Sequence, residues 1–156
     1  MKKAVMFDLV HRINPAMVWL LQSRVHRVAS SGLMLIRYRG RKSDREFTTP
    51  VGLNRFDDTV IILVSDAVRR QWWRNFCAPW PIQLCLQGRW HIGRAVVLRA
   101  ELDDYAYWLE RCLQRSRFMP KLFNLDYDRK MGLSGEDVAN MDAYAVIVKV
   151  ELSGSQ

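Results

Sequence analysis

The chain has 156 residues, of which 49% are apolar and 11% aromatic, and its formal net charge is +8 at pH 7. This size and composition predict a single domain over residues 1–156 and exclude an intrinsically disordered chain. The charge favours an anionic partner, which leaves nucleic acid, a phosphorylated cofactor and an acidic membrane surface open. The cysteines are Cys77, Cys85 and Cys112, an odd number without a CxxC pair, which argues against a disulfide framework and a zinc site.

The N-terminal segment, residues 1–31, is predicted to be helical. A first helix covers residues 4–13, and Asn14-Pro15 begins a second because Asn is a good N-cap and Pro suits the first helical position. The apolar run at residues 15–21 is shorter than the roughly 18 residues that a membrane span needs. Asp8 interrupts the apolar region after the basic start, so we expect no signal peptide and a cytoplasmic protein.

The predicted core of the fold, residues 33–100, consists of strands joined by tight turns. Alternating or continuously apolar patterns predict strands at residues 33–39, 47–55, 59–65, 82–87 and 90–99. The strand at 59–65 is β-branched and apolar throughout, so we expect it to be buried on both faces. Residues 69–77 read as a short helix that ends before Pro79.

The C-terminal part adds a helix and a last strand. A helix is predicted at residues 102–118, whose apolar residues share one face: Tyr105, Trp108, Leu109, Cys112 and Leu113. A loop at 119–132, one or two helical turns at 135–141 and a strand at 142–152 complete the chain. Hairpin-length links imply antiparallel pairing. The predicted fold is therefore mainly β with α (α+β): a six-stranded antiparallel barrel with peripheral helices.

The sequence contains no recognisable catalytic or metal-binding motif. The histidines, His11, His26 and His91, are scattered, and no GxSxG, HExxH, Walker or GxGxxG pattern occurs. We therefore expect no catalytic side chain and no metal ligand. If the protein is an enzyme, a cofactor carries the reaction.

Two basic segments are candidates for binding an anion. The first is the turn between the first two strands, where Arg41, Lys42 and Ser43 offer two cations and a hydroxyl. The alternative is a solvated hairpin tip. The second is the segment SDAVRRQWWRNFC, in which Ser65 ends a buried strand and Arg69 begins the predicted helix. Its tryptophans could form the floor of a binding site for a flat aromatic ligand, or they could simply anchor the helix on the barrel.

Together these segments resemble the deazaflavin-dependent nitroreductase family, small split β-barrel proteins of the flavin and F420-dependent oxidoreductase group. Members read as a strand, then G-R-[KR]-[ST]-G-x-x-x-x-T-P-[LV], and later W-x-x-N-[LF]. The matching residues here are Gly40-Arg41-Lys42-Ser43-Asp44, Thr48-Thr49-Pro50-Val51, Trp72 or Trp73, and Asn75-Phe76. The resemblance covers about residues 33–100 and, loosely, the last strand.

The resemblance implies a split-barrel reductase that uses F420 or FMN. The cofactor's phosphate and acidic tail would lie on the loop of Arg41, Lys42 and Ser43, with the Thr49-Pro50-Val51 backbone along the ring. The remaining implied cofactor-binding residues are Ser65, Arg69, Trp72, Trp73 and Asn75. The reduced ring would pass a hydride to a quinone, nitroaromatic or similar acceptor.

Three positions differ from the family pattern. Asp44 replaces a glycine, Phe47 stands where many members have arginine, and residues 66–68 lack the usual glycines. These differences leave F420, FMN and loss of the cofactor open.

Two other functions stay open from the sequence. One is a split-barrel protein that binds a lipid or other anionic amphiphile without redox chemistry, with the N-terminal helices and Trp19 touching a membrane surface. The other is nucleic-acid binding, which no RNP, KH or helix-turn-helix signature supports. Monomer and homodimer are equally open.

Overall fold

The computed structural model describes residues 32–101, 103–123 and 125–153. The predicted N-terminal helices, and any membrane contact through them, lie outside these residues. The described residues fall into two compact units. The first takes in the described residues up to Leu53, Pro81–Gly93 and the residues after Glu151, and the second comprises Asn54–Trp80 and Arg94–Glu151. Of the described helices, all lie in the second unit, and both units contain strands.

The described residues contain seven strands, one more than the six predicted. The predicted strand at 47–55 is in fact two, β2 (Glu46–Gly52) and β3 (Asn54–Phe56). The chain changes its pairing partner between these two strands: β2 pairs with β1, whereas β3 pairs with β4. At the break, the Leu53 N–H donates to the Gly32 carbonyl. The apolar pattern continues through this change of partner, so periodicity does not reveal it.

The first unit contains β2, β1 (Leu33–Arg39), β5 (Trp80–Leu86) except its first residue, and the start of β6 (Arg89–Leu98), in that hydrogen-bonded order. β1 pairs antiparallel with β2 over its whole length, and its Leu35 lies opposite Cys85 of β5. Leu35 and Cys85 are buried, with Trp90 packed against them. Gln87 and Gly88 both have positive φ, which is typical of a two-residue hairpin turn and links β5 to β6.

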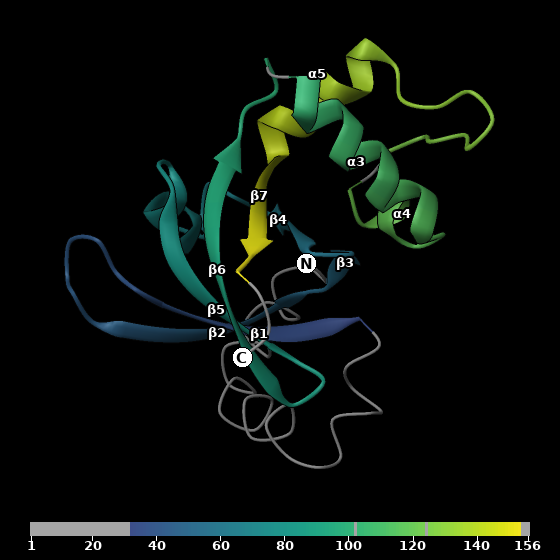
Figure 1. Cartoon of the computed structure of the whole chain (residues 1–156). Coiled ribbons are helices and arrows are strands. Elements are labelled where there is room, and N and C mark those ends of the chain that lie inside the picture. The colour runs from purple at the N-terminus through teal and green to yellow at the C-terminus, as the bar shows by residue number, and fades with distance from the viewer. Residues whose placement is uncertain (1–31, 102, 124, 154–156) are drawn as a thin grey trace, which may run out of the picture. The chain divides into compact units, whose positions relative to one another are not determined.

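The second unit contains the end of β6, then β7 (Ala145–Leu152), β4 (Thr59–Ser65) and β3. β4 pairs antiparallel with β7 along the whole length of β4, and Figure 1 shows the two strands side by side. Three consecutive residues of β4, Val60 to Ile62, are buried. This confirms the predicted burial of that strand on both faces.

Helix α3 (Asp103–Arg115) lies within the predicted range of 102–118 and covers the core of the second unit (Figure 1). Four residues of the predicted apolar face are fully buried in one cluster with Ile61, Met141 and Ile147: Tyr105, Leu109, Cys112 and Leu113. The predicted face is therefore confirmed. No helix in the described part of the chain is long and apolar enough to cross a bilayer.

Two boundaries near the C-terminus differ from the prediction. The predicted loop at 119–132 begins with a short helix, α4 (Met119–Leu122), whose first N–H donates to the Ser116 hydroxyl. Helix α5 (Gly135–Tyr144) is longer than expected, so the last strand begins at Ala145. A capping box explains its firm start, because the Ser134 and Asp137 side chains each accept the other's backbone N–H.

Of the three cysteines, Cys77 is exposed and the other two are buried. Burial raises the pKa of Cys112 to about 12, against the opposing effect of Arg115 and Arg111, and it also raises the pKa of Cys85. Because the thiolate is the reactive form, we expect a chromogenic disulfide reagent to modify one thiol rapidly in the native protein and all three after denaturation. Cys77→Ser should abolish the rapid phase. A second rapid thiol would contradict this burial.

Candidate functional site

The turn between β1 and β2 is closed by its own backbone. The Gly40 N–H donates to the Arg45 carbonyl at 2.9 Å, and the Asp44 N–H donates to the Gly40 carbonyl at 2.8 Å. A Cβ at Gly40 would lie 2.6 Å from the Ser43 hydroxyl oxygen and 3.0 Å from the Phe47 ring. Glycine therefore allows the tip to fold back over the start of the turn.

The tip presents the first group of predicted site residues to solvent. Arg41, Lys42 and Ser43 are all exposed. Within the described residues Lys42 forms no ion pair, and the Ser43 hydroxyl accepts the Arg45 N–H at 3.4 Å. Two cationic side chains thus stand next to each other on a hydrogen-bonded turn, an arrangement that suits a phosphate or carboxylate.

Asp44 occupies a position that favours glycine. Its φ of 52° lies in the left-handed region, which gives a conformational reason for the glycine in the family pattern. Its carboxylate lies 3.4 Å from Nη1 of Arg39, which also donates to the Asp44 carbonyl at 3.3 Å. Arg39, which sequence analysis did not single out, therefore offsets the negative charge beside the tip.

The predicted Thr49, Pro50 and Val51 lie on β2, opposite Ile36, Leu35 and Met34 of β1. Val51 is buried, whereas Thr49 and Pro50 are half-buried. Pro50 is tolerated because β2 stands at the end of the strand order, where one side of the strand has no ladder for proline to interrupt.

Two aromatic rings support this hairpin. Phe47 stacks on Tyr38 with ring centroids 5.6 Å apart, so the residue that replaces the family's arginine packs against the strand. Burial raises the pKa of the Tyr38 hydroxyl, and a hydrogen bond with Thr49 opposes that rise.

The remaining predicted residues belong to the second unit, beginning where β4 ends. Ser65, half-buried, pairs with Ala145. The next residue, Asp66, has a φ of 53° and so makes the sharp turn without glycine. Its carbonyl accepts the backbone N–H groups of Arg69 and Arg70 at 3.0 and 3.1 Å, and its carboxylate lies 3.8 Å from the Arg69 guanidinium. Arg69 is thus paired within its own turn while staying exposed.

The predicted helix at 69–77 is wrong in length and type. The structure has a five-residue 3₁₀ helix, η1 (Trp72–Phe76), and Arg69 precedes it within the Asp66 turn. The backbone hydrogen bonds of that turn close before the helix begins. So short a helix aligns few peptide dipoles, so its N-terminus gives little support to an anion.

The tryptophans of η1 pack against the protein. The Trp73 indole N–H donates to the Ala67 carbonyl at 2.8 Å. Trp72 meets the buried Phe76 edge-on, with centroids 6.1 Å apart, and its carbonyl accepts the Asn75 amide at 2.8 Å. These contacts favour the anchoring alternative over a ligand platform.

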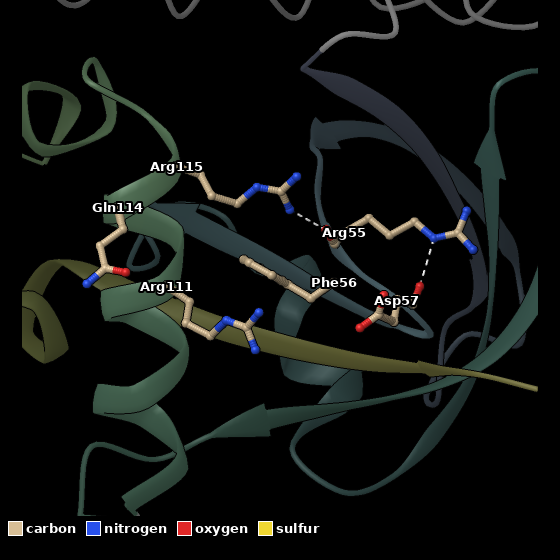
Figure 2. A pocket seen from close by; sticks show the side chains of 6 residues that line it. All are labelled: Arg55, Phe56, Asp57, Arg111, Gln114 and Arg115. Atoms are coloured by element: carbon tan, nitrogen blue, oxygen red, sulfur yellow. Dashed lines mark hydrogen bonds between the residues drawn. The ribbon is translucent and has the colours of Figure 1, made fainter.

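The structure also contains a pocket that the sequence did not suggest. It lies in the second unit and is lined by Arg55, Phe56, Asp57, Arg111, Gln114 and Arg115 (Figure 2). Arg111 and Arg115 are four residues apart on α3, a spacing that places them on one helix face. This spacing is the feature of the sequence from which the pair could have been predicted. No group of three potential metal ligands occurs among the residues that the structure describes.

Comparison with known proteins identifies the family. The sequence matches the F420H(2)-dependent quinone reductase family over residues 11–119. An F420-H2 dependent reductase, FDR-A, is 14% identical and covers 78% of this chain and 95% of its own, with a TM-score of 0.55. A structure described as a domain-swapped dimer is 13% identical and covers 87% of this chain and 99% of its own, with a TM-score of 0.53. No curated protein matches the sequence.

The two solved structures show a shared fold, and the family match extends over most of the chain. The chain therefore belongs to the F420H(2)-dependent quinone reductase family.

Proposed function

We propose that the basic tip of the β1–β2 hairpin holds the phosphate and acidic tail of F420. Family membership makes the protein an F420-dependent oxidoreductase of the quinone reductase type. The observation that carries our proposal is the tip itself, where Arg41 and Lys42 are exposed on a hydrogen-bonded turn. Arg39 offsets the neighbouring Asp44 carboxylate, so the replacement of the family glycine leaves the tip suited to an anion.

The hairpin residues fit the cofactor's chemistry. Arg41 offers a planar fork of donors to phosphate, Lys42 a point charge, and Ser43 a hydroxyl. The backbone of Thr49, Pro50 and Val51 offers a strand along which the ring can lie. When bound, reduced F420 supplies the two electrons and two hydrogens that convert a quinone into a hydroquinone, so this chain needs only to bind and orient.

The second unit supplies the other proposed cofactor-binding residues: Ser65, Arg69, Trp72, Trp73 and Asn75. The Ser65 hydroxyl and the exposed Arg69 guanidinium are the groups suited to an anion. The packing of Trp72 and Trp73 supports an indirect role for them, as anchors of the segment that carries Arg69.

F420 is the proposed cofactor rather than FMN, and a quinone the proposed acceptor, because the family match names both F420 and quinone reduction. A nitroaromatic acceptor is the alternative. Of the assemblies open from the sequence, the homodimer is supported by the domain-swapped dimer among similar structures. The cytoplasm is the proposed location.

The test is a fluorescence titration of the protein with F420 and, separately, with FMN, followed by a turnover assay with reduced F420 and a soluble naphthoquinone. We expect saturable tryptophan quenching by F420, weaker quenching by FMN and quinone-dependent oxidation of the reduced cofactor. Tighter binding of FMN would reverse the cofactor assignment. Quenching by neither would favour the non-redox binding of an anionic amphiphile.

Asp44→Asn is expected to tighten F420 binding by about 1.4- to fivefold, because an exposed like charge beside an anion costs roughly 0.2–1 kcal/mol. Asn tolerates the left-handed conformation, so the turn should persist. Asp57→Asn is the matched control, since Asp57 is also exposed and has a φ of 54° in a different hairpin. Titration of both variants checks the prediction, and weaker binding by Asp44→Asn would contradict it.

A further inference from the structure

A basic pocket of about 400 Å³ lies in the second unit, between α3 and the turn that joins β3 to β4 (Figure 2). Its lining includes three arginines and one acidic residue, Asp57. None of these residues is among those assigned to F420. The pocket therefore poses a separate question of what it binds.

Two of the arginines converge on one aromatic ring. The guanidinium carbons of Arg111 and Arg115 lie 4.6 and 4.8 Å from the centroid of Phe56. Figure 2 shows both side chains projecting from α3 toward the β3–β4 hairpin, whereas the Arg55 side chain runs away from α3. Phe56 is itself held against Trp108, with ring centroids 5.5 Å apart. The ring thus fixes two cations at one place.

Each of these guanidiniums is oriented by a single hydrogen bond within the described residues. Arg111 donates to the Tyr107 hydroxyl at 2.8 Å, and Arg115 donates to the Arg55 carbonyl. A guanidinium carries five N–H donors, so most of them stay available in each case. Cations held near one another repel, and a bound anion would relieve that repulsion.

The acidic residue of the pocket does not neutralise these cations. Asp57 forms no ion pair with Arg55, Arg111 or Arg115 among the described residues, and its backbone carbonyl is what accepts the Arg55 Nε–H, at 2.9 Å. The lining therefore carries an excess of positive charge.

We propose that this pocket binds the phosphate group of a small phosphorylated molecule, with Arg111 and Arg115 as its principal ligands. Two planar forks that are already oriented match the tetrahedral oxygens of a phosphate better than a single carboxylate. The volume exceeds that of a phosphate ion, and Phe56, which also lines the pocket, offers an apolar surface to the rest of the molecule. The same chemistry could meet a soluble phosphate monoester or a phospholipid headgroup.

The experiment is isothermal titration calorimetry of the full chain with phenyl phosphate at low salt, with inorganic phosphate as a second probe. All proteins carry Arg41→Ala and Lys42→Ala, so that the hairpin tip cannot supply the signal. We expect Arg111→Gln/Arg115→Gln to weaken binding at least tenfold and Arg117→Gln, an exposed arginine outside the pocket, to change it less than twofold. Asp57→Asn should act in the opposite direction and tighten binding.

Vesicles distinguish the source of the phosphate. Binding to phosphatidic acid vesicles but not to phosphatidylcholine vesicles, lost in the Arg111→Gln/Arg115→Gln variant and without binding of phenyl phosphate, would assign the pocket to a headgroup. Binding of phenyl phosphate alone would assign it to a soluble ligand. Arg111→Lys/Arg115→Lys keeps the positive charges but loses the planar guanidinium donors, so it should give an intermediate affinity.

The proposal fails if the parent protein binds neither phosphate compound nor phosphatidic acid, or if its affinity survives in Arg111→Gln/Arg115→Gln. The F420 titration is done separately on proteins with an intact hairpin tip. There the pocket substitution should leave F420 affinity unchanged, so that failure of the phosphate site and failure of the proposed cofactor site are read independently.

Discussion

Replacing Arg41 and Lys42 together by alanine is expected to weaken F420 binding about 100-fold, because each charge-assisted contact at an exposed site contributes roughly 1.5 kcal/mol. Both side chains are exposed at the hairpin tip, so their loss should leave the unfolding free energy nearly unchanged. Tryptophan quenching by F420 measures the affinity, and a thermal melt followed by circular dichroism verifies the fold.

A matched pair of arginines controls for the loss of net charge. Arg94 and Arg99 are exposed on or just after β6 and are not among the proposed ligands. Their double alanine variant should bind F420 within about twofold of wild type, since exposed charges that make no direct contact with the anion are largely screened by salt. Equal weakening in both double variants would show a general electrostatic effect. An unchanged affinity in the hairpin variant would remove the tip from the cofactor site.

Much of the fold follows from local patterns. β1 and β4 have the predicted bounds, and the apolar face of α3 is buried as its spacing indicates. These elements have strong periodicity and interior burial, which sequence encodes directly. The split at Leu53 was not predictable in the same way, because it depends on which strand each half pairs with, a non-local property.

The candidate site was predictable in its residue types and less so in its geometry. The exposed tip of Arg41 to Ser43 agrees with the prediction of an accessible basic turn. The prediction of a helix beginning at Arg69 was wrong. Asp66 adopts a positive φ, and its carbonyl accepts two backbone N–H groups in a turn that closes before the helix begins. The pairing of Arg39 with Asp44 depends on side-chain direction across a turn, which no spacing rule gives. The pocket lined by Arg111 and Arg115 could not be predicted from local sequence patterns, because it forms only where the β3–β4 hairpin packs against α3.

Trp73→Leu is expected to lower the free energy of unfolding by about 2–3 kcal/mol. This is less than the cost of truncating a fully buried aromatic side chain, because Trp73 is only half-buried. The indole is half-buried, and its N–H satisfies the carbonyl of the buried Ala67 at 2.8 Å. Trp73→Phe keeps most of the ring and loses that hydrogen bond, so we expect a cost of about 1 kcal/mol. Urea unfolding followed by circular dichroism measures both variants.

The F420 affinity of the same two variants decides what Trp73 does. If Trp73 is an anchor, the F420 affinity of the folded protein should change less than twofold in both variants, because the indole N–H is hydrogen-bonded to the turn that follows Asp66. If it is a ligand platform, Trp73→Leu should lose about tenfold or more in affinity, since stacking on an aromatic ring contributes roughly 1–3 kcal/mol. Loss of affinity without loss of stability would assign the ring to the cofactor and leave the turn to be held by its backbone alone.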